Sequence, residues 1–269
     1  MKKYIITIAA ALTVGLIAGC GGGSSTPAAS ATVSGKVADG YLVGATVFLD
    51  KNSNYQLDAG EPSTTTDANG GYSLTIDPAD VGKYPIVAMA IKGVTIDKDT
   101  NQTVSNSYTL SMPATAMSGT VNSNFISPMS SEVRELMETG KYATMQDAMN
   151  AMSTQLGLPA GTNMQADYMA ANNNTTMHTA AQNMANLMGS QMPQVMGTSG
   201  TTTTVDVNRY RVMMGTIFSN MSSIIGSNSQ STMTTLRDTM TTALGNMPMT
   251  VAGHPFTNMS SAFRGGRMK

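Results

Sequence analysis

The chain shows two successive patterns of apolar and polar positions. Over residues 32–114, short runs rich in apolar and β-branched residues alternate with turn residues, which is typical of β-strands. In one such run Tyr72, Leu74 and Ile76 alternate with polar residues, so they share the buried face of a strand. The runs that predict strands are Thr32–Val37, Ala45–Asp50, Tyr72–Ile76, Pro85–Lys92, Val94–Asp97 and Thr103–Met112. Their number and spacing predict an all-β sandwich of the Ig or prealbumin-like kind over residues 32–114.

Beyond about residue 121 the apolar period becomes helical and helix boundary signals appear. Ser127 followed by Pro128 predicts a capped helix start, and residues 144–147 predict a second cap, while Pro193 and Gly226 are expected to end later helices. The predicted helices cover about 128–139, 145–156, 175–192, 207–225 and 232–244, and polar connectors are expected at 161–174 and 197–204. The fold class expected is therefore α+β with two domains: the β-sandwich, then an all-α, Met-rich domain over 121–250 and a tail over 251–269.

The N-terminal segment predicts the compartment. Lys2 and Lys3 precede an apolar stretch of about 14 residues, which is too short to cross a bilayer and typical of a secretory signal. The stretch ends in Ile17-Ala18-Gly19-Cys20, which resembles the lipobox of bacterial lipoproteins, and Cys20 is the only Cys of the chain. The resemblance implies a signal peptide over 1–19, lipidation of Cys20 and a membrane anchor; an ordinary signal with an incidental Cys is the alternative. Residues 20–31, rich in Gly, Ser and Ala, predict a flexible tether.

We therefore expect a cell-envelope protein held by lipid, and the Gly after Cys20 favours the outer membrane, on its periplasmic side or its surface. The 15 Lys and Arg residues nearly balance the 16 Asp and Glu residues, which gives a formal net charge of -1. A nucleic-acid binder has to neutralise many phosphates, so that class of function is not expected.

The sharpest chemical signal is the segment Asp50–Glu61, between two predicted strands. Oxygen-bearing side chains stand at positions 1, 3, 5, 7, 9 and 12 of this segment, the ligand positions of an EF-hand calcium loop. The candidate Ca²⁺ ligands are Asp50, Asn52, Asn54, Gln56, Asp58 and Glu61, with Gln56 contributing its main-chain carbonyl. Leu57 is expected as the apolar anchor beneath the loop.

One position departs from the calcium-loop pattern. Position 6 is normally Gly because the turn there needs a positive φ, and this chain has Tyr55. Either the turn differs or the calcium affinity is reduced. A polar, Asn-rich hairpin loop without metal is the alternative interpretation.

The loop and its flanks resemble a known class of β-domain. Residues 44–50, the loop, Gly60-Glu61-Pro62 and then 66–74, with the turn Thr66-Asp67-Ala68-Asn69-Gly70-Gly71-Tyr72, are similar to B-type repeats of surface adhesins and to carboxypeptidase-regulatory-like sandwiches. That resemblance covers about 40 residues and implies a calcium loop between strands, with a role in adhesion or support. Asp67 is expected to cap its own turn. Residues 125–133 and the short helix after them resemble a segment that follows such domains in secreted bacterial lipoproteins, without an assigned chemistry.

Methionine is the compositional anomaly, because 21 of the 25 Met residues lie after residue 120. Their helical spacing predicts that Met replaces Leu as the core-filling residue. A pliable Met surface for partner helices and a Cu(I) site built from thioethers are the alternatives. The candidate copper clusters are Met145, Met149 and Met152; Met184, Met188, Met192 and Met196; and Met247 and Met249 near His254.

No catalytic motif is evident. The two His residues, His178 and His254, lie outside any metalloprotease pattern, and the chain has no nucleophile elbow or phosphate-binding Gly-rich loop. Glu132, Glu135 and Glu138 are interpreted as a solvated helix face. We expect a non-catalytic binding or structural module stabilised by Ca²⁺, with a Cu(I)-binding envelope protein and an enzyme of unrecognised type as the alternatives.

Overall fold

The computed structural model describes residues 30–117, 124–170, 174–199, 202–226 and 230–249. Within these ranges the chain has an α+β fold, with sheets in its N-terminal part and helices in its C-terminal part. The expected signal peptide, Cys20, nearly all of the tether, the tail and His254 lie outside the described residues. None of the helices in the described ranges is both long and apolar enough to cross a bilayer.

The N-terminal part contains two larger sheets and one small one. The sheet order β4-β3-β6-β9 joins Ser63–Thr65, Thr46–Leu49, Ile86–Ala90 and Tyr108–Met112, all antiparallel. The second sheet has the order β10-β1-β5, formed by Asn124–Ile126, Ala31–Val37 and Gly71–Ile76. A small sheet joins β2 (Leu42–Val43), β7 (Ile96–Asp97) and β8 (Gln102–Thr103). In β5, Tyr72, Leu74 and Ile76 are buried and alternate with exposed positions, which confirms the predicted strand face.

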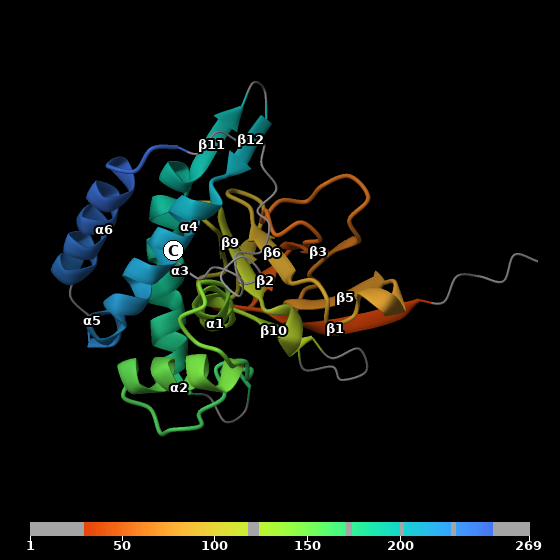
Figure 1. Cartoon of the computed structure of the whole chain (residues 1–269), viewed down its shortest axis with the longest axis horizontal. Coiled ribbons are helices and arrows are strands. Elements are labelled where there is room, and N and C mark those ends of the chain that lie inside the picture. Colours follow the sequence, from red (N-terminus) through yellow and green to blue (C-terminus); the bar gives the residue numbers. More distant parts are fainter. Residues whose placement is uncertain (1–29, 118–123, 171–173, 200–201, 227–229, 250–269) are drawn as a thin grey trace, which may run out of the picture.

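The helices lie together on one side of the strands, as Figure 1 shows. They are α1 (Pro128–Glu138), α2 (Met145–Gln155), α3 (Thr175–Val195), α4 (Val207–Ser219), α5 (Met221–Gly226) and α6 (Gln230–Gly245). The predicted caps are confirmed, since Ser127 accepts from the N–H of Ser130 and Thr144 from that of Asp147. A hairpin of β11 (Met196–Ser199) and β12 (Thr202–Val205) follows α3.

Several predicted boundaries are wrong. The strand expected over 103–112 is interrupted, because the N–H of Val104 donates to Thr95 and the chain turns before β9 begins. The helix expected over 207–225 breaks at Asn220, whose side-chain amide donates to the Thr216 carbonyl. The α3 helix passes Pro193 and ends at Val195, and the connector expected over 197–204 forms the β11–β12 hairpin.

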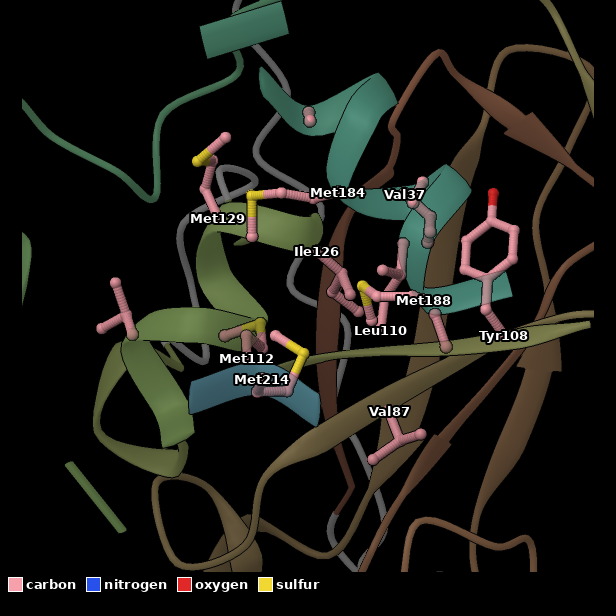
Figure 2. Close-up of a cluster of buried hydrophobic side chains, with 14 of the residues drawn as sticks. Val37, Val87, Tyr108, Leu110, Met112, Ile126, Met129, Met184, Met188 and Met214 are labelled. Atoms are coloured by element: carbon pink, nitrogen blue, oxygen red, sulfur yellow. The ribbon is translucent and has the colours of Figure 1, made fainter. Parts of the chain in front are cut away.

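Strands and helices share one hydrophobic core. β10 follows the last strand of the first sheet and pairs in parallel with β1, and the chain enters α1 two residues later. Buried residues of both regions form a single cluster. Figure 2 shows Met184 and Met188 of α3 and Met129 of α1 among Leu110 and Ile126 of the strands.

Methionine fills this core, as its helical spacing predicted. The side chains of Met129, Met184, Met188, Met213 and Met214 have no exposed surface. Unbranched thioether chains adapt to irregular gaps, so they suit the space between a twisted sheet and several crossing helices. The buried Met side chains therefore join the helices to the sheets.

Truncating Met188 tests this role. Met188→Ala is expected to lower the free energy of unfolding by about 2–5 kcal/mol, because it leaves a cavity, while Met188→Leu keeps the volume and costs under about 1.5 kcal/mol. Urea unfolding of both variants measures the difference. Met249→Ala is the matched control because Met249 is 42% exposed. Equal effects at positions 188 and 249 would contradict the assigned core role.

Candidate functional site

The candidate metal loop, residues 50–61, joins β3 to the segment before β4. It begins with three nested turns in which side chains accept from main-chain N–H groups. Asp50 Oδ1 accepts from Asn54 at 3.0 Å, Asn52 Oδ1 from Asn54 at 3.2 Å, and Asn54 Oδ1 from Gln56 at 2.9 Å. The contacts of Asn52 and Asn54, which each span two residues, are Asx turns, and they fix these two side chains against the loop backbone.

Three of the predicted ligands converge. The amide nitrogens of Asn52 and Asn54 both donate to Asp58 Oδ2, each at 2.7 Å. The amide oxygens of Asn52 and Asn54 accept from main-chain N–H groups, so a cation beside Asp58 would need both amides to turn and direct their oxygens towards it. The donor set of carboxylate and amide oxygens is one that Ca²⁺ accepts.

Two other predicted ligands, Asp50 and Glu61, make contacts elsewhere. Glu61 closes the loop, since its Oε1 accepts from the Lys51 N–H at 2.7 Å and its Oε2 from the Asp58 N–H at 3.0 Å. Asp50 has no exposed surface and lies 3.5 Å from Arg134 Nη2. Across the described residues no three His, Cys, Asp or Glu side chains gather closely enough to hold a metal ion. A cation in this loop would therefore depend on amide and main-chain oxygens as much as on carboxylates.

Position 6 of the loop keeps its left-handed backbone although the residue is not Gly. Tyr55 has a φ of 62° and is 1% exposed. A left-handed conformation costs a non-glycine residue about 1–2 kcal/mol. Burial of an aromatic ring offsets that cost, because a large apolar surface leaves water.

The prediction that Leu57 anchors the loop is wrong. Leu57 is 42% exposed, and Tyr55 is the buried side chain beneath the loop. The positive φ of Tyr55 turns its ring inward, where it packs on the Tyr210 ring with centroids 4.5 Å apart. Tyr55, the residue that departs from the calcium-loop pattern at position 6, is thus also the loop's main contact with the helices. The turn at Asp67 is confirmed, since its Oδ1 accepts from the N–H groups of Asn69 and Gly71.

Beneath the loop lies a group of buried charges that we call the ion network. Its members come from the loop, α1 and α4: Asp50, Tyr55, Arg134, Glu135, Glu138, Tyr210 and Arg211. Arg134 has no exposed side-chain surface, and its Nε donates to Glu138 Oε1 at 2.7 Å. The guanidinium carbon lies 4.1 Å from the centre of the Tyr55 ring, a cation–π contact. The Tyr55 hydroxyl donates to Glu135 Oε1.

The environment of the network lowers the pKa of Glu138 and raises the pKa values of Glu135 and Asp50. Burial raises the pKa of Glu135 to about 7, and the negative charge of Glu138 adds to the rise. Burial acts in the same direction on Glu138, but Arg134 and Arg211 outweigh it and hold the pKa of Glu138 below its usual value. Burial also raises the pKa of Asp50, against Arg134 and the N–H groups it accepts from. The network therefore combines one acid held in its charged form with others that burial drives towards the neutral form.

The interpretation of the α1 carboxylates as a solvated face is wrong. Glu132 is 0% and Glu135 2% exposed, because α1 is packed between β9 and other helices rather than lying on the surface. The position of Glu132 is the extreme case, since neither carboxylate oxygen has a hydrogen-bond partner among the described residues. Burial raises the pKa of Glu132 well above its usual value, with a further contribution from Glu135. Burial without a hydrogen-bond partner therefore favours the protonated form of Glu132 in the folded chain.

Most of the copper candidates lie in the core, whereas Met249 is exposed. Met149, Met152, Met184, Met188 and Met192 are each at most 7% exposed, and their side chains belong to the shared hydrophobic cluster. Met145, Met196 and Met247 are partly buried against it. His178 contacts Asp99 Oδ2 at 2.6 Å and stacks on Tyr168, away from these clusters.

Comparison with known proteins gives no relative: no family model matches the chain, and no curated protein or solved structure matches it.

The buried Glu132 predicts a specific pH dependence. Below the unfolded-state pKa of about 4.3 both states hold the proton, so Glu132 adds no pH dependence. Above it the unfolded chain loses the proton and the folded chain keeps it, so stability falls by about 1.4 kcal/mol per pH unit until the folded-state pKa is reached. Glu132→Gln is expected to remove this contribution, which makes its slope shallower than that of the native chain, and to be more stable than the native chain at pH 8. The raised pKa values of Glu135 and Asp39 leave a residual slope up to about pH 7.

Urea unfolding at pH 5, 6, 7 and 8 measures the difference between the native chain and Glu132→Gln. Asp238→Asn, at an exposed position of α6, is the control and is expected to keep the native slope. Parallel pH profiles for the native chain and Glu132→Gln would show that Glu132 is ionised in the folded state.

Proposed function

We propose that this chain is a non-catalytic binding or structural module of the bacterial cell envelope, anchored by lipid at Cys20 and stabilised by Ca²⁺ in the loop 50–61. In this proposal the sheets correspond to an Ig or prealbumin-like β-sandwich of the kind found in adhesin B-type repeats. The antiparallel order β4-β3-β6-β9 and the shared core with β10-β1-β5 support that correspondence.

The observation that carries the proposal is the convergence of Asn52, Asn54 and Asp58. The side-chain amide nitrogens of Asn52 and Asn54 lie 2.7 Å from Asp58 Oδ2, in a loop whose sixth residue has the left-handed backbone of a calcium loop, and a cation would replace these N–H donors with the amide oxygens. Six oxygen-bearing residues at the expected spacing add to it. Calcium is abundant outside the cytoplasm, so a site of modest affinity would be occupied in the envelope.

The ion network gives Ca²⁺ binding a consequence for the whole module. Asp50 belongs to both the loop and the network, and Tyr55 passes from the loop to Glu135 and Tyr210. A cation that fixes the loop would hold these two residues against α1 and α4. We therefore propose that Ca²⁺ stiffens the contact between the sheet region and the helices, so that the module presents a rigid surface to its partner.

A calcium titration tests the proposal. The mature chain with Cys20→Ser stays in solution, and 5 mM Ca²⁺ is expected to stabilise it by about 1–2 kcal/mol if the dissociation constant lies near 0.1–1 mM, as in extracellular EF-hand modules. Asp58→Asn removes one charge at the point of convergence and should weaken Ca²⁺ binding at least tenfold. Thermal unfolding with Ca²⁺ and with Mg²⁺ measures both effects.

Asp77→Asn is the matched control, because Asp77 caps the short helix Pro78–Asp80 and Asn caps equally well. It should keep the full calcium response. A native chain whose stability does not change with Ca²⁺, or one that binds Cu(I) stoichiometrically instead, would contradict the proposal and favour the Met-rich copper alternative.

A further inference from the structure

A polar cleft lies beside α3, and none of the residues that line it belongs to the ion network. The loop after β1, the β7–β8 hairpin and α3 enclose a volume of about 490 Å³. Gln102, Thr103 and Asn106 line one wall, and Gln182, Asn186 and Gly189 of α3 line the other. This volume lies within the range of small-molecule sites.

One side chain in this cleft lacks a partner. Asp39 lines the cleft and is 8% exposed. Its Oδ2 accepts from the Tyr108 hydroxyl at 2.7 Å, while its Oδ1 has no hydrogen-bond partner among the described residues. Figure 2 shows the Tyr108 ring at the edge of the hydrophobic cluster with its hydroxyl directed away from Leu110 and Met188. A buried acceptor without a donor costs about 1–3 kcal/mol, so a ligand that donates to Oδ1 would gain that energy.

Two further carboxylates lie beside Asp39, and one of them, Asp99, is paired with His178. Asp97 and Asp99 stand over Gly40, where a Cβ would come within 2.4 Å of Asp97 Oδ1 and 2.6 Å of Asp99 Oδ2. Burial raises the pKa of Asp39 to about 7, and the charges of Asp97 and Asp99 add to the rise. None of the described residues that line the cleft is Lys or Arg. The nearby Lys98 turns away, with its ammonium donating to the Ala68 carbonyl at 3.0 Å.

These features indicate which class of ligand the cleft could bind. An anion would meet carboxylates of its own sign. A bound sugar would lack an aromatic face to stack on, because Tyr108 is the aromatic residue among those lining the cleft and it is 5% exposed. A cation with several N–H donors would meet the negative charges of Asp39 and Asp97. It would also meet the side-chain oxygens of Asn186 and of Gln182, whose amide nitrogen already donates to Asp99 Oδ2.

We propose that this cleft binds the cationic end of an organic ligand, an ammonium or guanidinium group, with Asp39 as its charge partner. Such a group is carried by free amines and by the Lys and Arg side chains of peptides. The glutamine and asparagine side chains on the two walls would orient the uncharged part of the ligand. This site is separate from the loop 50–61, so its test does not depend on calcium.

Calorimetric titration of the mature chain with Cys20→Ser tests the site. The probes are 1,5-diaminopentane as a free amine, Nα-acetyl-lysine amide and Nα-acetyl-arginine amide as peptide side chains, and 1,5-pentanediol as the uncharged analogue. Saturable binding of at least one cation is expected, at least tenfold tighter than binding of the diol. The tightest probe distinguishes a free amine from a basic side chain.

Two variants test whether the cation binds in the cleft. Asp39→Asn keeps an acceptor for Tyr108 and removes the charge, and Asn186→Phe fills the cleft from an exposed position of α3. Each is expected to weaken cation binding at least tenfold, while Asp238→Asn on α6 leaves it unchanged. Absence of saturable binding by every cation, equal binding of the diol, or equal weakening by Asp238→Asn would overturn the proposal.

Discussion

The buried charge of Arg134 is the constraint on which this structure depends. A guanidinium group stays protonated in proteins, so a fully buried Arg requires acceptors and counter-charges around it. Here Glu138, Asp50 and the ring of Tyr55 provide them, from α1 itself and from the loop 50–61. The loop is therefore held to the helices by an electrostatic requirement as well as by packing.

That requirement explains why a tyrosine occupies the sixth position of the loop. A Gly there would relieve the left-handed backbone but would leave Arg134 without its aromatic partner and Glu135 without its hydroxyl donor. The Tyr55 ring also fills the space between the loop and Tyr210. A small conformational cost inside the loop is thus offset by contacts outside it. In consequence, whatever fixes the loop also acts on α1 and α4.

Local sequence signals predicted much of the fold. Alternation in β5, the caps of α1 and α2, and the helical spacing of Met residues each depend on residues close in the chain, and the structure confirms them. The parallel pairing of β10 with β1 joins residues about 90 positions apart and has no local signature. Pro193 within α3 and the break at Asn220 also escaped prediction, because tertiary packing overrides weak local preferences.

The loop 50–61 was predicted because its signal is local, whereas the ion network beneath it was not predicted. The spacing of Asp50, Asn52, Asn54 and Asp58 identified the loop, and three of these side chains converge. The network beneath it was missed, because a periodic run of charged residues on a helix is usually solvated. The one available signal was Ser130 and Ser131 beside the acids of α1, small residues that allow a helix to pack closely on a strand.

Arg134, Tyr55 and Asp50 join the loop 50–61 to α1, so the two segments should respond together to a ligand. Hydrogen exchange of residues 20–269 with Cys20→Ser, followed by mass spectrometry with and without Ca²⁺, measures this coupling. We expect Ca²⁺ to slow exchange both in the loop and in residues 131–138 of α1, while exchange in α6 stays unchanged. Protection confined to the loop, with α1 unaffected, would contradict this coupling.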